Sequence, residues 1–197
     1  MGTKKNNWLG FFKEFKLHKA CANDEIRPAM QYVCFKNGYA YATDAHIAVR
    51  ARLTDICALG EEEISKLNGH LIHKSQYEQL LKYSTIEIGD GTITLIDPES
   101  KARTTIQLFK LAESGEEVLE GCIRYPNVDA IINQDGEHSE ADRVKFNYNL
   151  LGRLVAAMGM NGSRVGLRFT GKGRQLVVTG VEPGLDVRGI IMPIVGD

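Results

Sequence analysis

The sequence predicts an α+β fold of antiparallel sheets with few helices, built from a repeated unit of one strand, one helix and three strands. Short segments rich in β-branched and aromatic residues are joined by tight turns, which is typical of antiparallel strands. Residues 74–84 and 149–159 carry apolar residues at helical spacing. Three strand-like segments follow each of them, so the unit appears at residues 70–110 and again at 144–194. A repeat of this length indicates a pseudo-symmetric architecture.

The N-terminal quarter of the chain is a candidate for a third copy of the unit. Residues 30–36, 39–43 and 46–52 have the composition of strands, and Lys-Asn-Gly at residues 36–38 is typical of a hairpin turn. Residues 10–22 fit a helix with apolar residues at helical spacing, and they also fit an alternating strand. Both interpretations of this segment stay open.

Strand patterns follow both helical segments. After the first, residues 85–89, 92–97 and 102–111 predict an antiparallel meander. Residues 144–149 predict the strand that opens the second unit. Its last three strands are predicted at residues 164–169, 174–180 and 187–194.

The chain divides into four parts by composition. Residues 1–9 form a basic tail, and residues 10–133 carry the first two copies of the unit. Residues 134–143 are polar and acidic without apolar periodicity, which predicts a linker. Residues 144–197 then form a half-domain with a single copy of the unit.

Length and composition are those of a globular protein. The 197 residues allow one large domain or two small ones, and 43% of them are hydrophobic and 25% charged. No apolar run is long enough to span a bilayer, and no signal-peptide core follows the N-terminus, so we expect a cytoplasmic protein. The four cysteines form no Cys-x-x-Cys pair, which argues against a zinc site.

Asp44 and His46 are candidates for catalytic or metal-binding chemistry, because residues two apart in an extended segment share a face. With His70 and His73 they would suit a small metal-dependent hydrolase, which is one alternative for the function. No catalytic motif completes the set, and His70 and His73 would face opposite sides of an extended segment. The favoured interpretation is that Asp44 and His46 brace a turn. No catalytic residue, metal ion or cofactor is predicted.

The net charge of −1 means that any nucleic acid would have to meet a local basic patch. Lysines cluster early in the chain between aromatic residues, a pattern that fits either phosphate contact or a solvated face. The predicted set of weak DNA contacts consists of Lys13, Lys16, Lys19, Arg27, Lys74 and Arg153.

Three short motifs occur in a fixed order: Ala-Thr-Asp-Ala-His at residues 42–46, Arg-Tyr-Pro-Asn-Val-Asp-Ala-Ile-Ile at 124–132 and Ile-Ile-Met-Pro-Ile at 190–194. In order and approximate spacing they resemble signatures of the bacterial sliding clamp family, the β subunit of the replicative DNA polymerase. Residues 10–133 resemble the middle domain of that clamp, and residues 144–197 resemble the second half of its last domain.

The resemblance implies a clamp-like fold and a non-enzymatic function in DNA replication. Sliding clamps are rings that encircle duplex DNA, and they bind short peptides of DNA polymerases and repair proteins in an apolar pocket between the middle and last domains. By position, the resemblance assigns nine residues of this chain to that pocket: Met30, Thr43, Ala45, His46, Ile47, Pro126, Ile131, Ile190 and Met192.

The resemblance leaves two alternatives open. The half-domain at residues 144–197 either packs on the main domain or pairs with a second chain to form a homodimer. The protein either contacts duplex DNA or is a clamp mimic that captures partner peptides alone, and its abbreviated architecture suggests a phage or another mobile element. Ala45 stands where the family has glycine, so a positive φ at this position would be strained.

Overall fold

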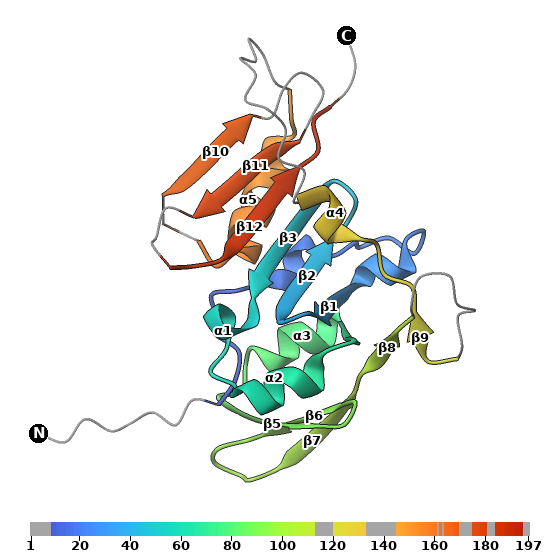
Figure 1. The fold of residues 1–197 in the computed structure, drawn as a ribbon. Coiled ribbons are helices and arrows are strands. Elements are labelled where there is room, and N and C mark those ends of the chain that lie inside the picture. Colours follow the sequence, from blue (N-terminus) through green and yellow to red (C-terminus); the bar gives the residue numbers. More distant parts are fainter. Residues whose placement is uncertain are drawn as a thin grey trace, which may run out of the picture.

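The computed structural model describes residues 9–112, 120–132, 145–160, 162, 164–169, 175–180 and 184–194. Within these ranges, nine strands form one sheet and three strands form a second, smaller sheet (Figure 1). Helices pack against both faces of the large sheet. The described chain is therefore an α+β structure with mostly antiparallel sheets, as the sequence predicts.

The large sheet runs through both parts of the chain. Neighbouring strands pair antiparallel, except β8 and β9, which pair parallel. In spatial order its strands are β10 (Val165–Phe169), β11 (Leu176–Gly180), β12 (Val187–Ile191), β3 (Ile47–Arg52), β2 (Tyr39–Thr43), β1 (Tyr32–Lys36), β4 (His70–His73), β8 (Phe109–Leu111) and β9 (Cys122–Ile123).

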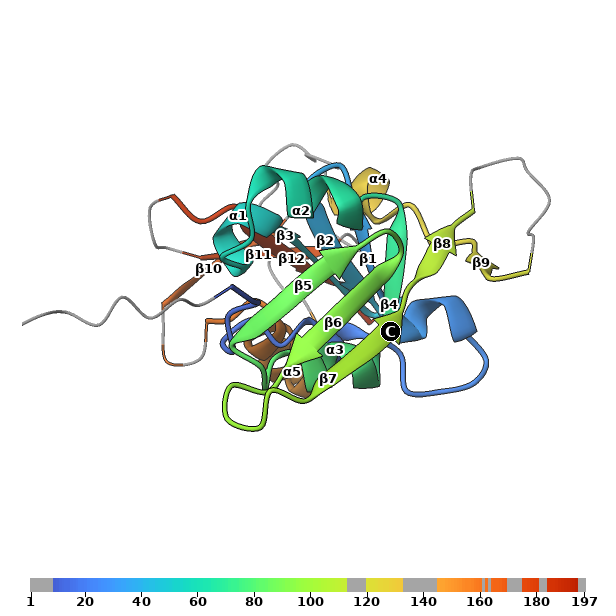
Figure 2. The ribbon, with the colours of Figure 1, turned by 90° about the horizontal axis from the view of Figure 1, so that it is seen from below.

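The small sheet is an antiparallel meander at the end of the molecule away from β10, β11 and β12 (Figure 1). Figure 2, seen from below, shows its strands in front of the large sheet. The strands are β5 (Thr85–Gly89), β6 (Thr92–Ile96) and β7 (Arg103–Gln107). This sheet confirms the meander predicted after the first helical segment.

The helices are divided between the two faces of the large sheet. The 3₁₀ helix η1 packs between α3 and α5 on one face, and α4 packs on β3 and β12 from the other face. Their bounds are η1 (Leu17–Ala20), α3 (Lys74–Leu80), α4 (Val128–Ile132) and α5 (Tyr148–Ala157), and the remaining helices are η2 (Pro28–Gln31), α1 (Leu53–Ile56) and α2 (Glu61–Leu67).

Alternating side chains explain why both faces of the sheet are covered. In β11 and β12, Val178 and Ile191 belong to the main core on the side of α5, whereas Val177 and Ile190 belong to a second core on the side of α4. All four side chains are at most 1% exposed. The second half of the chain therefore supplies apolar residues to both cores, and these hold it to the rest of the molecule.

The two halves of the chain meet where β3 pairs with β12, a line that we call the seam. Its register places Ile191 opposite Ile47 and Val187 opposite Ala51. The described residues between 145 and 194 thus pack on the first part of the same chain, which is one of the two arrangements left open by the sequence. The predicted linker at 134–143 and the predicted tail, apart from Leu9, lie outside the described residues.

Most of the predicted strands and both predicted helices are present. The turn between β1 and β2 has positive φ at Asn37 (52°) and Gly38 (79°), which is the geometry of a tight hairpin turn. Helix α3 ends at Leu80, earlier than helical spacing suggests, and α5 begins at Tyr148. Among the described residues, no helix has the length and apolar character needed to cross a membrane.

The structure corrects the strand predicted at residues 144–149. In the described part of this segment, residues 145–147 form no regular element, and α5 begins directly after them. The side chain of Asn147 accepts a hydrogen bond from the backbone N–H of Asn149 at 3.0 Å. Asn147 is therefore the N-cap of α5, and a cap residue stops an extended strand from continuing.

The single strand predicted at residues 102–111 is also wrong, because the segment divides between the two sheets. Leu108, which is 5% exposed, packs in the main core and separates β7 from β8, whereas Phe109 packs against the second core. The segment at residues 10–22, for which helix and strand were both open, contains a single short helix, η1.

Candidate functional site

The first motif of the resemblance, at residues 42–46, contains the end of β2 and the compact turn that leads into β3. The Asp44 Oδ1 atom accepts hydrogen bonds from the backbone N–H groups of His46 at 2.8 Å and Ile47 at 2.9 Å. The Thr43 hydroxyl donates to the Ile47 carbonyl at 2.8 Å and accepts from the Ala45 N–H at 3.1 Å. Asp44 therefore braces the turn, as the favoured interpretation expected, and His46 takes part through its backbone.

An ion pair fastens this turn to the second half of the chain. The Arg153 Nη2 atom on α5 lies 2.8 Å from the Asp44 Oδ2 atom, and the Asp44 side chain is only 8% exposed. Arg153 also donates to the Lys19 carbonyl from Nε at 3.2 Å and from Nη2 at 3.1 Å. One guanidinium thus joins the turn, η1 and α5, which are far apart in the sequence.

Exposed apolar side chains lie directly after β12, next to the turn, and at the end of α4. The Met192 N–H donates to the His46 carbonyl at 2.8 Å, which continues the pairing of β12 with β3. Gln175, which precedes β11, donates to the Ile131 carbonyl at 3.2 Å and so ties the end of α4 to the same sheet. We call the exposed side chains of this region the apolar patch: Ile131 (36% exposed), Met192 (40%) and Ile194 (57%).

The nine residues assigned to the peptide pocket fall into three groups by exposure. Thr43, Ile47 and Ile190 are buried and support the turn and the sheet from within. Met30 and Pro126 are half-buried, in η2 and directly before α4. The four that are exposed to a partner are Ala45, His46, Ile131 and Met192.

Sequence reasoning missed two exposed apolar residues near these positions. Ile194 donates its N–H to the Lys145 carbonyl at 2.9 Å and is more exposed than Met192. Ile26 is 87% exposed and precedes Arg27, whose guanidinium donates to the Asp44 carbonyl at 3.0 Å. Both residues lie outside regular elements, and the resemblance assigned neither of them to the peptide pocket.

A basic cavity of about 720 Å³ lies on the helical side of the molecule, away from the apolar patch. Four lysines and a histidine line it, together with two glutamates, and three of the lysines belong to the predicted DNA contacts. Its charged lining residues are Lys13, Glu14, Lys16, His18, Lys19, Glu78 and Lys82. Partial burial lowers the pKa of His18, Glu78 opposes this, and Lys19 and Lys16 lower the pKa further.

The other three predicted DNA contacts hold loops of the protein. Lys74 donates to the Ala22 carbonyl at 2.6 Å and to the Asn23 side chain at 2.9 Å. Arg27 and Arg153 both hold the turn around Asp44. Lys82 and His18, by contrast, join the basic cavity although their sequence positions gave no sign of it.

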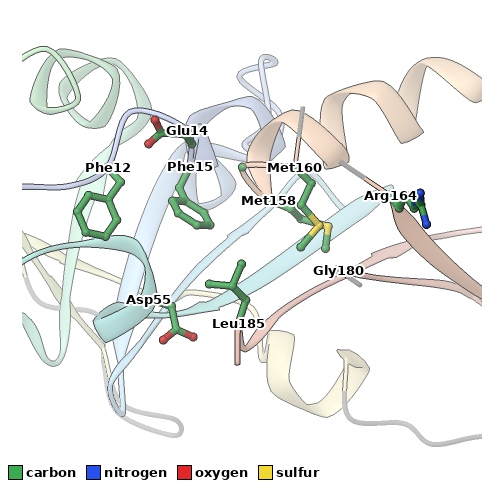
Figure 3. A pocket seen from close by; sticks show the side chains of 10 residues that line it. Phe12, Glu14, Phe15, Asp55, Met158, Met160, Arg164, Gly180 and Leu185 are labelled. Atoms are coloured by element: carbon green, nitrogen blue, oxygen red, sulfur yellow. The ribbon is translucent and has the colours of Figure 1, made fainter. Parts of the chain in front are cut away.

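A second cavity, of about 300 Å³, lies between the two halves of the chain (Figure 3). We call it the seam cavity. Its described lining comprises Phe12, Glu14, Phe15, Asp55, Met158, Gly159, Met160, Arg164, Gly180 and Leu185. None of the nine residues assigned to the peptide pocket lines either of these two cavities.

The alternative of a metal-dependent hydrolase has no support. His70 and His73 lie at opposite ends of β4, and their Nδ1 atoms bond to the Asn68 carbonyl at 3.1 Å and to the Ser75 hydroxyl at 2.8 Å. Asp44 is engaged by Arg153 and by backbone N–H groups. Within the described ranges, no three His, Cys, Asp or Glu side chains are grouped as a metal site requires.

The backbone of Ala45 has a positive φ of 72°. Strain is expected in this conformation, because Ala45 stands where the sliding clamp family has glycine. Replacing Ala45 with glycine is expected to raise the free energy of unfolding by about 0.5–1 kcal/mol, because glycine adopts this backbone without a Cβ conflict. Thermal unfolding followed by circular dichroism measures the gain. Ala102→Gly is the control, since Ala102 has no positive φ and glycine there should bring no gain. Equal effects of the two substitutions would contradict the strain.

Comparison with solved structures identifies proteins with a similar fold. No protein-family model matches the sequence, and no curated protein matches it. The β chain of DNA polymerase III from Streptococcus pneumoniae matches with a TM-score of 0.60 at 12% identity, over 93% of this chain and 62% of that one. The β subunit from Pseudomonas aeruginosa matches with a TM-score of 0.57 at 12% identity, over 98% and 68%. A β subunit from Eubacterium rectale matches with a TM-score of 0.57 at 10% identity, over 99% and 64%.

Sequence identities of 10% to 12% do not indicate a shared function, so these matches support a similarity of fold alone. The chain spans 62% of the length of the Streptococcus pneumoniae protein. The three structural matches nevertheless cover 93%, 98% and 99% of this chain. The chain therefore has the α+β fold of the bacterial sliding clamp.

Proposed function

We propose that this protein is a non-enzymatic, sliding-clamp-like component of DNA replication that docks short peptides of polymerase or repair partners at the apolar patch. The observation that carries the proposal is the hydrogen bond from the Met192 N–H to the His46 carbonyl, at 2.8 Å. It joins two of the three motifs of the resemblance, which are separated by most of the chain. Both halves of the chain thus contribute to one apolar surface.

The chemistry of the apolar patch favours a peptide with apolar anchors. Met192 has a flexible, polarisable side chain that adapts to different partners, and Ile131 and Ile194 add exposed aliphatic surface. Anchors such as Leu and Phe would bury this surface with an affinity of about 1 μM, near −8 kcal/mol. In the same fold, the sliding clamp of C. crescentus (TM-score 0.51, 13% identity) holds polyethylene glycol at its proposed β-motif tethering region.

Replacing Met192 with aspartate is expected to weaken the binding of a labelled peptide with Leu and Phe anchors by at least about 30-fold. A carboxylate at this position would lose its water when the peptide covers it. Because Met192 is 40% exposed, the fold should tolerate the change. Fluorescence anisotropy measures the affinity.

The matched control for this experiment is Leu167→Asp. Leu167 is 42% exposed on β10, outside the apolar patch, so the same change there should leave peptide affinity unchanged. Unchanged binding by the Met192 variant, or equal losses in both variants, would count against docking at the patch.

A second component of the proposal is contact with duplex DNA through the basic cavity. Lys13, Lys16 and Lys19 line this cavity with Lys82, and their ammonium groups would neutralise backbone phosphates. A clamp mimic that captures peptides alone would lack this contact. The salt dependence of the affinity for duplex DNA distinguishes a DNA-contacting protein from a clamp mimic, because phosphate contacts release counterions on binding.

Replacing Lys16 and Lys19 together with glutamine is expected to weaken duplex binding and to reduce the slope of log affinity against log salt by about 2. Anisotropy with a labelled duplex at several salt concentrations measures the slope. Lys101→Gln is the control, since Lys101 lies on an exposed loop where it donates to the Pro98 carbonyl. No duplex affinity in the unmodified protein would favour the mimic.

A further inference from the structure

The walls of the seam cavity are apolar and come from both halves of the chain (Figure 3). Phe12 and Phe15 lie on one side, and Met158, Met160 and Leu185 lie on the other. Aromatic rings and thioethers form a favourable surface for another ring, through edge contacts and through sulfur–aromatic contacts. A volume of about 300 Å³ is at the small end of the range for ligand pockets, so it suits a compact molecule.

Two glycines allow the walls to approach as closely as they do. A Cβ atom at Gly180 would lie 2.2 Å from the Met160 Cε atom, and one at Gly159 would lie 2.8 Å from the Phe15 Cδ1 atom. Any side chain at either position would displace a wall residue. The shape of the cavity therefore depends on these two residues.

The charge at one end of the cavity favours a cation. Asp55 brings a carboxylate to one end of the lining, below Phe15, and Arg164 lies at the other end beside Met160 (Figure 3). Glu14 lies on the opposite side of Phe15 from Asp55 in this view, and it also lines the basic cavity. Asp55 is held in place, because its Oδ2 atom accepts a hydrogen bond from the Asp186 N–H at 2.8 Å. The Asp55 carboxylate attracts an ammonium group to this end of the cavity, where the group can also face the ring of Phe15.

We propose that the seam cavity binds a small organic cation, an ammonium group attached to one aromatic ring. The ring would lie between the phenylalanine and methionine side chains, and the ammonium group would lie beside Asp55. This site is separate from the apolar patch, with which it shares no residue. A ligand here contacts both halves of the chain, so it also stabilises their packing.

Three probes of similar size and different charge test the proposal on the full chain: phenethylammonium, 2-phenylethanol and 3-phenylpropionate. The methyl resonances of Met158 and Met160 report occupancy of the cavity in methionine-labelled protein. We expect shifts at both residues, with the cation binding about two- to fivefold more tightly than the alcohol and the carboxylate binding most weakly. No shift with any probe, equal affinity for cation and alcohol, or tightest binding of the carboxylate would overturn the proposal.

Two variants complete the test. Asp55→Asn removes the carboxylate, keeps an oxygen acceptor for the Asp186 N–H and is expected to reduce the preference for the cation without reducing the affinity for the alcohol. Leu185→Trp fills the cavity from a half-buried position and is expected to abolish the methyl shifts for all three probes. Peptide binding at the apolar patch should survive in both variants, which shows that they fold and separates this proposal from the proposed function. Full cation preference in the Asp55 variant would overturn the assignment.

Discussion

Replacing Asp44 with alanine is expected to lower the free energy of unfolding by about 3 kcal/mol. The substitution removes the acceptor for two backbone N–H groups of the turn and leaves the Arg153 guanidinium without its carboxylate. The Asp44 side chain is 8% exposed, so water replaces it poorly. Thermal and urea unfolding measure the loss, which corresponds to a fall in Tm of roughly 6–12 °C for a chain of this size.

Asp97 supplies a matched control for Asp44. Its Oδ1 atom also accepts two backbone N–H groups, from Glu99 at 3.0 Å and Ser100 at 2.7 Å, but the turn is exposed and carries no ion pair to another element. Asp97→Ala should therefore cost only about 1 kcal/mol. Equal losses in the two variants would mean that the pair between Asp44 and Arg153 adds nothing to the fold.

Arg153→Ala and the double variant with Asp44→Ala isolate the ion pair from the turn. If the guanidinium and the carboxylate stabilise each other, the double variant loses less than the sum of the single variants. The Arg153 side chain is 33% exposed, so part of its contribution is screened by water. We expect a coupling of about 1 kcal/mol.

Local patterns explain which parts of the fold were predictable from the sequence. The hairpin from β1 to β2 has alternating residues and an Asn-Gly turn, and both features act over a few residues. Helices α3 and α5 present one apolar face each, which gives helical spacing. In each case the residues that determine the structure are neighbours in the sequence.

The errors arose where distant contacts override local pattern. Residues 102–111 read as one strand, but burial of Leu108 in the main core sends the next residues to the other sheet. The segment at 10–22, for which helix and strand were both open, fills the main core with Phe11 and Phe15 from irregular chain and with Leu17 and Ala20 from the short helix η1. The intrinsic helix or strand propensity of a segment predicts its secondary structure poorly where tertiary burial determines it.

The resemblance predicted that separate motifs of the chain would meet, but it did not predict how exposed their residues are. The motifs at residues 42–46 and 190–194 do meet, along the pairing of β3 with β12. The burial of Ile190 beneath α4 follows from sheet pairing that no local pattern contains. Arg153 was predicted to be a weak DNA contact, and its partner Asp44 could be found only from the packing of the two halves.

Replacing Gly189 with valine is expected to lower the free energy of unfolding by about 3 kcal/mol and to loosen residues 145–194 first. Gly189 lies in the middle of β12 on the face covered by α5. A Cβ atom there would lie 2.7 Å from the Leu154 Cδ1 atom and 2.8 Å from the Met158 sulfur atom. Both side chains are fully buried, so α5 has to move away from the sheet.

Gly152→Ala, on α5 itself, is the opposite case. No atom lies within 4 Å of a Cβ at Gly152, and its backbone is helical, so alanine should raise the free energy of unfolding by about 0.5–1 kcal/mol.

Hydrogen exchange of α5 amides shows where the structure opens. In the Gly189 variant we expect faster exchange in α5 than in α3, because α3 packs on β1 and β4 rather than on β12. If the amides of α3 and α5 exchange at equal rates in the Gly189 variant, α5 is not held to the molecule through the seam. The apolar patch would then not depend on the packing of the two halves of the chain.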